Sequence, residues 1–516
     1  MKLKEYKIFP VLVFILSLLL FAAIFYLNRS FMGNFDEFDH IVAGYAMKQG
    51  RVLYSQHFTN HFPLPYYWIY LFTPLWSATS PARTLSVFRL SLLILYLISY
   101  VLVFFTFKKN TSKYCFSLWI SIISLFFVVY LGYIIITDTF IAIFVSSMAW
   151  ITLPILLKWE KPSAYSHLLL IIFGSMAFWT QPMLFFLLFV PFLMVKEKKS
   201  IIKWSLFTLI LNSIPLLFFY LNKQLYDFLF QGFYFNFKVY SPYYYDMAGL
   251  TGNHTVSLIM LYVKNEFLFL KGLSNPLQIV QFIFHLSFLW MLLTLIKTRN
   301  IRHIVLFLLL FFASRIREVK AAVGTSFDVG IYPFIMLASA CFIFFIIEAM
   351  KSKKIGVKLF SLALLTIIIV ANTMTFQQIF FQSLKPEYNY HVFWSPKQEK
   401  GSIIKSLSLP TESVLMYPHD VDLYYFSDRL SPDRFSYWFP WINAWSEYRE
   451  ERLNALKKNP PSVIYIGNLG YGSDKNYYAR YFPQLTDNYI EVIKKGEKTG
   501  VWLRKDLQER LKNIRG

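Results

Sequence analysis

Charged residues are scarce in this chain of 516 residues: Asp, Glu, Lys and Arg together make up only 16% of it. A soluble domain has about 25% charged residues, whereas this chain is 56% hydrophobic and has a mean hydropathy of +0.45. These values exclude an ordinary soluble protein. Together with an aromatic content of 20%, they indicate a protein with many membrane-spanning segments.

Cysteine is nearly absent, since the chain has only Cys115 and Cys341, and both lie in apolar runs. A disulfide framework and a cysteine-based metal site are therefore excluded. Acidic residues are also few, 29 against 51 basic ones, which gives a net charge of +22. The basic residues concentrate in short loops between apolar runs, where they orient a membrane protein, so we expect no nucleic-acid partner.

Eleven apolar runs are candidates for membrane-spanning helices, which need about 20 residues, or fewer where a helix is broken. Three of the runs are short, and the two around Thr180-Gln181-Pro182 could form one bent element. The runs are 8–27, 87–107, 114–131, 140–157, 167–179, 183–195, 204–221, 276–296, 304–313, 331–350 and 355–374.

The distribution of Lys and Arg predicts the orientation of these helices. Five short connections are rich in basic residues, whereas the turns 132–138 and 180–181 contain none. Because cytoplasmic loops carry an excess of Lys and Arg, we expect a multi-pass protein of the cell membrane with a cytoplasmic N-terminus. Merging the two doubtful runs would place later basic loops outside, which favours eleven helices. The basic connections are 108–113, 158–161, 196–199, 297–302 and 351–354.

Three long segments then face outward: residues 28–86, residues 222–275 and the C-terminal tail. The tail has 20 basic and 16 acidic residues, with four strand-like runs and a helical one at 443–457. The predicted fold is an all-α polytopic membrane domain over residues 1–375, with about 11 transmembrane helices. It is followed by a small extracytoplasmic α/β domain over residues 376–516. The strand-like runs are 413–417, 462–466, 489–494 and 500–504.

The first outer segment holds a group of ionisable residues, Asp36, Glu37, Asp39 and His40. Asn34 or Asp36 can cap a helix there, acidic residues suit its first turn, and Gly50 suits its end. On such a helix Asp36, Asp39 and His40 share one face. They could form a catalytic base or a cation site, or they could only cap and solubilise an interfacial helix.

Downstream, His57 and His61 have the i, i+4 spacing of a metal-ligand pair. Pro63 and Pro65 favour an extended chain there, which weakens that interpretation. The aromatic residues around them, Tyr66 included, suit the headgroup level of a membrane.

These residues resemble the GT-C superfamily of membrane glycosyltransferases. The resemblance rests on Asp36-Glu37 after the first helix, on Gly50 with Leu53-Tyr54, and on the segment His61-Phe62-Pro63-Leu64-Pro65-Tyr66-Tyr67. The most similar branch is that of the protein O-mannosyltransferase-like and aminoarabinose-transferase-like enzymes. Asp138 between two helices and the outer C-terminal domain extend the resemblance along the whole chain.

The resemblance implies a polyprenyl-phosphate-linked sugar as donor, and a surface polymer, lipid or protein as acceptor. It also implies inverting transfer at the outer face of the membrane. Asp36 would then be the base, with Glu37 beside it and Asp138 as the second acidic position. The residue composition is typical of an AT-rich bacterial genome, which favours undecaprenyl phosphate as the carrier.

Sugar transfer from a lipid phosphate needs a base for the acceptor and positive charge for the leaving phosphate. Arg315, Arg317 and Lys320 after the ninth helix are candidates for binding this phosphate, as is Arg89. The alternative is that the late cluster only anchors a helix end by snorkelling. In the family such a basic residue precedes a Tyr-Pro like Tyr332-Pro333, but here the segment 321–330 is longer and lacks the usual histidine.

The remaining site residues have open roles. Asp138 could orient the acceptor or help to bind a divalent cation, or it could only be a helix N-cap. Asp39, His40, His57, His61, Tyr66 and Tyr332 are candidates for an acceptor or sugar pocket. No cofactor is certain, although a divalent cation on Asp36, Asp39 and His40 is possible. The competing function is a transporter or flippase, but no pair of related halves is evident.

Overall fold

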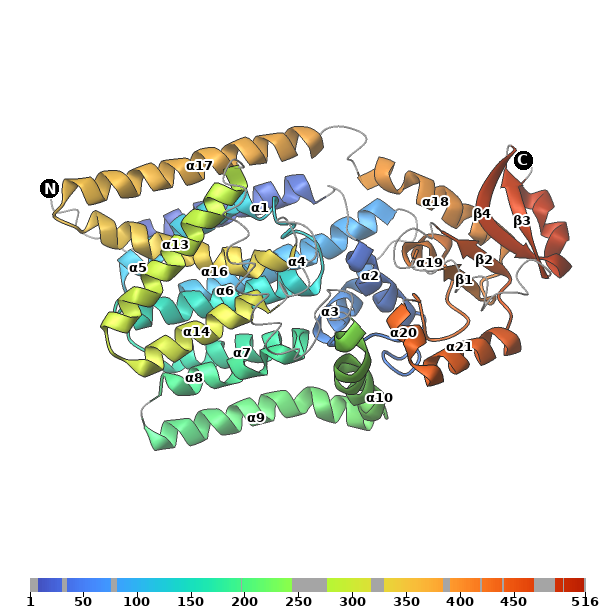
Figure 1. Cartoon of the computed structure of the whole chain (residues 1–516), viewed down its shortest axis with the longest axis horizontal. Helices are drawn as coiled ribbons and strands as arrows, with labels where there is room; N and C mark the ends of the chain where they lie inside the picture. Colours follow the sequence, from blue (N-terminus) through green and yellow to red (C-terminus); the bar gives the residue numbers. More distant parts are fainter. Residues whose placement is uncertain are drawn as a thin grey trace. The chain divides into compact units, whose positions relative to one another are not determined.

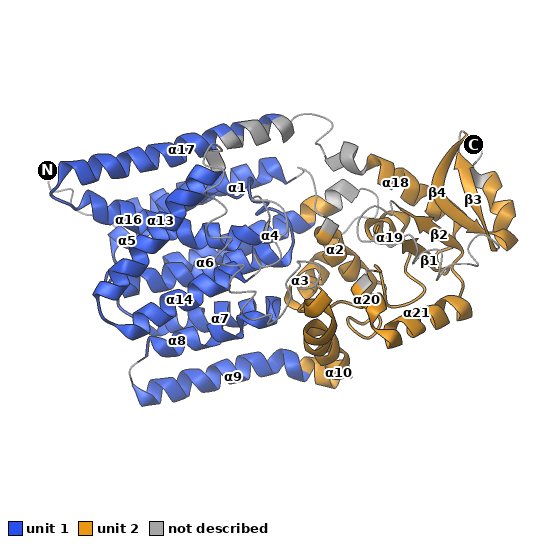
Figure 2. Ribbon diagram, viewed as in Figure 1, with its two compact units in different colours: residues 1–31, 88–217, 250–385 blue, residues 32–87, 218–249, 386–516 orange. Residues whose placement is uncertain are grey.

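The computed structural model describes residues 8–29, 35–75, 81–195, 197–243, 276–316, 329–383, 390–417, 420–438, 440–467, 488–494 and 496–514. The chain forms two compact units, each assembled from three segments that are distant in sequence (Figure 2). Unit 1 comprises residues 1–31, 88–217 and 250–385, and unit 2 comprises residues 32–87, 218–249 and 386–516.

Unit 1 is built from long apolar helices (Figure 1). Seven helices of the described chain are long and apolar enough to cross a membrane: α1 (Phe9–Asn28), α4 (Pro81–Phe104), α6 (Thr137–Leu156), α9 (Lys198–Leu221), α13 (Pro276–Lys297), α16 (Tyr332–Met350) and α17 (Ile355–Ser383). The shorter elements are α5 (Asn110–Phe126), α7 (Ala164–Thr180), η2 (Pro182–Phe189), α8 (Val190–Leu193), α14 (Ile301–Arg315) and η5 (Val329–Ile331). Each predicted apolar run thus contains a helical element, while the number of membrane crossings stays a prediction.

The predicted apolar run 183–195 is helical but is not one continuous α-helix. The chain there forms a 3₁₀-helix, η2, followed by the single α-helical turn α8. Pro191 has no backbone N–H to donate, which interrupts a continuous α-helix at this point. Gln181, in an extended conformation, separates η2 from α7. The two elements pack so closely that a Cβ on Gly174 would lie 3.1 Å from the carbonyl oxygen of Leu187.

The helices of unit 1 differ in how far they are buried by the rest of the protein. The spanning window of α6 is 100% buried inside the protein, whereas those of α9 and α17 are 11% and 22% buried. Lipid covers such apolar surfaces in a membrane protein. The loosely packed α9 is nevertheless tied to α7, because Asn212 accepts a hydrogen bond from the indole of Trp179 (2.9 Å) and donates one to Ser175 (2.9 Å).

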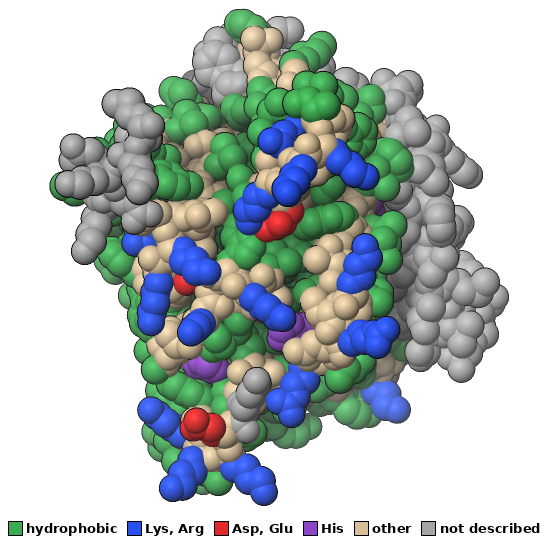
Figure 3. Space-filling view, turned by 90° about the vertical axis from the view of Figure 1, so that its left-hand side faces the viewer, with side chains coloured by type: hydrophobic (Ala, Val, Ile, Leu, Met, Phe, Trp, Pro, Cys, Tyr) green, Lys and Arg blue, Asp and Glu red, His purple; other side chains and the backbone are tan. Residues whose placement is uncertain are grey.

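The short basic loops gather at one end of unit 1. Lys and Arg side chains spread across this face (Figure 3). Two acidic residues connect the loops: Glu160 accepts hydrogen bonds from the backbone of Lys108 and Lys109 (3.3 and 2.9 Å), and Glu348 accepts one from the indole of Trp159 (3.0 Å). Loops from three different helix pairs therefore meet at one face, as the positive-inside pattern predicts.

Unit 2 contains the C-terminal sheet that the sequence predicts. Its strands are β1 (Val414–Tyr417), β2 (Val463–Ile466), β3 (Tyr489–Lys494) and β4 (Glu497–Arg504), in the order β1-β2-β4-β3. β1 and β2 are parallel, and the other two pairs are antiparallel. The predicted helix is confirmed as α21 (Ser446–Lys458). The remaining elements are α2 (Phe35–Lys48), α3 (Leu64–Phe72), η1 (Thr73–Leu75), α10 (Leu225–Leu229), the π-helix η3 (Phe230–Tyr240), α18 (Tyr390–Leu407), α19 (Asp422–Ser427), α20 (Pro440–Ala444) and η7 (Lys505–Ile514).

The outer segments and the tail form one body within unit 2. Arg51 of the first segment donates to the backbone carbonyl oxygens of Asp433 (2.7 Å) and Ser431 in the tail. Gln231 of the second segment donates to the carbonyl oxygen of Tyr54 (2.6 Å). The backbone N–H of Phe58 donates to the carbonyl oxygen of Arg434 (2.7 Å). The tail and the two outer segments thus pack together as parts of unit 2.

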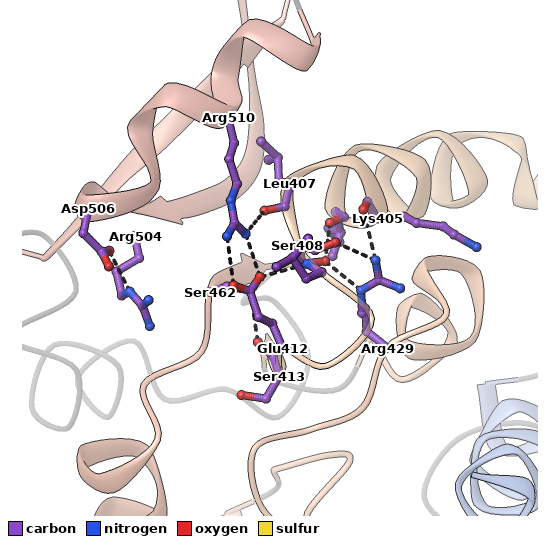
Figure 4. Close-up of polar contacts among 12 residues, drawn as sticks. Lys405, Leu407, Ser408, Glu412, Ser413, Arg429, Ser462, Arg504, Asp506 and Arg510 are labelled. Atoms are coloured by element: carbon purple, nitrogen blue, oxygen red, sulfur yellow. Dashed lines mark hydrogen bonds and ion pairs between the residues drawn. The ribbon is translucent and has the colours of Figure 1, made fainter.

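Arginine side chains close the tail on itself (Figure 4). Arg510 forms two parallel hydrogen bonds with the carboxylate of Glu412 (2.6 and 3.0 Å), which lowers the pKa of that carboxyl. Arg429 donates to Ser408 (2.9 Å) and to the carbonyl oxygen of Lys405 (3.2 Å). These contacts fix η7 and α18 against the loops of the sheet.

Candidate active site

Helix α2 forms where the sequence predicts it. Asp36 and Glu37 occupy its first turn, where carboxylates interact favourably with the helix dipole. Gly50 follows the helix with φ +86°, a conformation that glycine adopts without strain. Asn34, the other predicted cap, lies outside the described residues.

The two acidic residues at the start of α2 have opposite environments. Asp36 is exposed, whereas the side chain of Glu37 is completely buried. Only the first of these carboxylates is therefore accessible to a substrate.

Asp39, one turn further along α2, lies inside unit 2. Its Oδ2 accepts a hydrogen bond from the hydroxyl of Tyr66 (2.8 Å), and that hydroxyl accepts one from Thr59 (2.7 Å). Its other carboxyl oxygen, Oδ1, has no hydrogen-bond partner among the described residues. Burial raises the pKa of the Asp39 carboxyl to about 7; the bond from Tyr66 opposes this rise, and the charge of Asp36 adds to it. Asp39 therefore holds a proton up to neutral pH.

His40 connects Asp36 with Tyr66. Its Nδ1 lies 2.8 Å from the backbone carbonyl oxygen of Asp36, and its ring stacks on Tyr66 with 4.7 Å between ring centroids. The ring of His61 is 6.2 Å from that of His40. The structure thus assembles Asp36, Asp39, His40, His61 and Tyr66 around the packing of α2 on α3.

A metal site from these residues is not supported. Among the residues that the structure describes, no three His, Cys, Asp or Glu side chains are placed to hold a metal ion. Asp36, Asp39 and His40 do not form the cluster considered from their spacing, because Asp36 is exposed while the other two are buried. His57 is also buried, and burial lowers its pKa to about 3, so it is neutral.

The aromatic cluster is not an interfacial belt. Phe58, Phe62 and Tyr66 are completely buried in unit 2. The predicted extended chain at the prolines is wrong, since Pro65 lies at the start of α3, where its missing N–H costs nothing. The exposed apolar residues lie further along, at Tyr70, Leu71 and Leu75.

In unit 1, Asp138 lies in the first turn of α6 and is 6% exposed. The alternative of a helix N-cap is wrong, because the cap position is Ile136. The neighbouring hydroxyls of Thr137 and Thr139 are buried and have no hydrogen-bond partner among the described residues. This helix start is thus polar and enclosed, at the end of unit 1 away from the basic loops.

Two of the predicted phosphate-binding residues are buried arginines. Arg89 donates to the backbone carbonyl oxygen of Arg29 (2.8 Å), and its guanidinium lies 4.9 Å from the ring centre of Tyr133. Arg315 is 3% exposed and lies 4.3 Å from the ring centre of Phe334. Snorkelling is therefore wrong for Arg315, which points into the protein. Arg317 and Lys320 lie outside the described residues.

Tyr332, at the start of α16, lies against Tyr96 of α4 and against the turn at Gly132. Its hydroxyl lies 3.0 Å from that of Tyr96, which donates to the carbonyl oxygen of Gly132 (3.1 Å). A Cβ on Gly132 would lie 2.6 Å from the Tyr332 ring, so only glycine allows this approach. Sequence reasoning missed Tyr96, Gly132 and Thr59, because no local pattern marks a residue whose partner is distant in the chain.

The predicted site residues are thus divided between the two units. Asp36, Glu37, Asp39, His40, His57, His61 and Tyr66 belong to unit 2. Arg89, Asp138, Arg315 and Tyr332 belong to unit 1. The acidic and histidine groups of unit 2 suit proton transfer, and the buried arginines of unit 1 suit an anionic group.

Comparisons with known proteins place the fold. No family model matches the chain, and no curated protein matches it. The crystal structure of the oligosaccharyltransferase of Archaeoglobus fulgidus in the apo form is similar, with a TM-score of 0.51 and 12% sequence identity. The match covers 89% of this chain and 70% of that one. The likeness is one of fold: this chain shares the overall fold of that archaeal oligosaccharyltransferase.

Proposed function

We propose that this protein is a membrane glycosyltransferase that moves a sugar from a polyprenyl phosphate to an acceptor, with inversion at the anomeric carbon. The carrier would be undecaprenyl phosphate, and the acceptor a surface polymer, lipid or protein outside the cytoplasm. The GT-C type of fold supports the class of reaction. The observation that carries the assignment of the base is the exposure of Asp36 beside a fully buried Glu37.

The proposed step uses one carboxylate. Asp36 accepts the proton of the acceptor group while the acceptor atom bonds to the anomeric carbon. The bond from that carbon to the phosphate oxygen breaks, and the electron pair leaves with the phosphate. The positive charges of Arg89 and Arg315, which are buried in unit 1, would stabilise the leaving phosphate electrostatically, and Asp138 would orient the acceptor. A phosphate leaves without a general acid, so the paired carboxylates of glycoside hydrolysis are not needed.

The remaining residues of unit 2 would position the base. His40 is within hydrogen-bond distance of the Asp36 backbone, and its stacking on Tyr66 fixes its ring. In unit 1, the hydroxyl of Tyr332 is within hydrogen-bond distance of that of Tyr96, and Tyr332 would shape the acceptor or sugar pocket without transferring a proton.

Complementation of a deletion strain tests the proposal. Envelope glycans, lipids and proteins would be compared by mass spectrometry in cells that produce wild-type protein, Asp36→Asn or the control Glu450→Gln. We expect loss of one sugar modification with Asp36→Asn only, at equal protein levels. Wild-type amounts of product with Asp36→Asn would exclude Asp36 as base. Solute uptake into liposomes that contain the purified protein, without sugar transfer, would favour the transporter instead.

A further inference from the structure

Unit 2 has an open groove that the proposed reaction does not use. It has a volume of about 560 Å³ and is lined by Lys48, Tyr67, Tyr70, Leu71, Thr73 and Pro74. One wall is the end of α2, and the other is α3 with η1. The lining combines exposed apolar side chains with a single cationic one, Lys48, which is the exposed last residue of α2.

The end of α9 indicates the level of the groove in the membrane. Tyr67 packs edge-on against Phe218, with 5.6 Å between ring centroids, and also contacts Phe219. Both phenylalanines belong to the last turn of α9, which is long and apolar enough to cross a membrane. The groove therefore lies beside the end of a helix of membrane-spanning length, and such helix ends lie at the level of lipid headgroups.

The exposed face beside the groove is apolar. Tyr70 is 44% exposed and Leu71 is 66% exposed, and Leu75 continues this face. Tyrosines at such a level are typical of membrane interfaces, and an exposed leucine there is in contact with acyl chains. A positive charge above an apolar surface complements a lipid that has an anionic headgroup and an apolar chain.

We propose that this groove is a binding site for an anionic phospholipid of the surrounding bilayer. Its phosphate would pair with Lys48, and its chain would lie along Tyr70 and Leu71. Such a lipid would fix the packing of α2 on α3. The inference does not depend on sugar transfer.

Native mass spectrometry of the full-length protein in detergent tests the site. Phosphatidylglycerol and phosphatidylcholine with identical acyl chains would be titrated separately. We expect wild-type protein to prefer phosphatidylglycerol, and Lys48→Gln to weaken its binding by about fivefold, the ordinary effect of one basic residue near an anionic surface. Leu71→Ser should weaken the binding of both lipids. Lys223→Gln is the matched control, because Lys223 is an exposed lysine just after α9 that does not line the groove.

Two outcomes would overturn the proposal. One is equal binding of both lipids by wild-type protein, and the other is an unchanged preference for phosphatidylglycerol in Lys48→Gln. If the unchanged preference in Lys48→Gln is accompanied by a raised KM for the polyprenyl-phosphate sugar, the groove belongs to the donor. Loss of sugar transfer in Asp36→Asn bears only on the proposed function, so the two proposals fail separately.

Discussion

The hydroxyl of Tyr66 donates a hydrogen bond of 2.8 Å to Oδ2 of Asp39, and this bond joins α3 to α2 inside unit 2. It connects residues that are 27 positions apart in the sequence. The same two helices carry Asp36, His40 and the groove beside Lys48. The bond therefore bears on the geometry of the proposed base and on that of the lipid site.

Replacing Tyr66 by Phe should destabilise the protein by about 1–3 kcal/mol, because buried polar atoms of Asp39 and Thr59 would lose their partner. Thermal unfolding in detergent, followed by tryptophan fluorescence, measures the loss. Tyr70→Phe is the control, since Tyr70 is exposed. Equal unfolding temperatures for Tyr66→Phe and wild type would contradict the role of this bond.

Asp39 should make stability depend on pH. Its pKa is about 7 in the folded protein and 3.8 in the unfolded reference, so between these values the folded state binds the extra proton. The free energy of unfolding should therefore fall as pH rises from about 4 to about 7, by up to about 4 kcal/mol, and stay level above that.

Asp39→Asn should remove this dependence, because an amide keeps the acceptor for Tyr66 and does not ionise. Unfolding curves from pH 4 to 8 compare the variants, with the exposed Glu450→Gln as control. An unchanged pH slope in Asp39→Asn would mean that another group carries the titration.

Asn212→Leu should loosen α9. The substitution removes the hydrogen bonds to Trp179 and Ser175, and polar contacts between helices in a membrane contribute about 0.6–1.7 kcal/mol. We expect a lower unfolding temperature and greater separation of spin labels placed on α7 and α9. Ser213→Ala is the matched control, because the hydroxyl of the exposed Ser213 donates to the carbonyl oxygen of Leu209 within its own helix. Equal label distances in both variants would show that lipid packing alone holds α9.

Gly132→Ala should be poorly tolerated. The new methyl group would lie 2.6 Å from the Tyr332 ring, and overpacking of this kind costs about 1–3 kcal/mol. Its displacement of Tyr332 should also reduce the activity of the folded fraction. Gly356→Ala is the control, because no atom of the described residues lies within 4 Å of a Cβ there. Wild-type stability in Gly132→Ala would contradict the close approach.

The accuracy of the predictions differs between local and distant features. Strand β3 lies at the predicted residues, and α2 ends at its predicted signal, Gly50, because both depend on neighbouring side chains. The segment 183–195 was harder to predict, since hydropathy does not distinguish an α-helix from a 3₁₀-helix. The predicted phosphate-binding role of Arg315 stays a prediction, and its burial beside Phe334 has no local signal in the sequence.

The sequence by itself determined the membrane class, the basic face and the existence of a C-terminal sheet, because composition and periodicity depend on each residue alone or on its near neighbours. Only the tertiary structure decided which carboxylates are accessible. Asp36, Glu37 and Asp39 are chemically alike and lie within four residues of each other. Their different exposures follow from what α3 and the C-terminal tail bring against α2, and those contacts come from segments far apart in the chain.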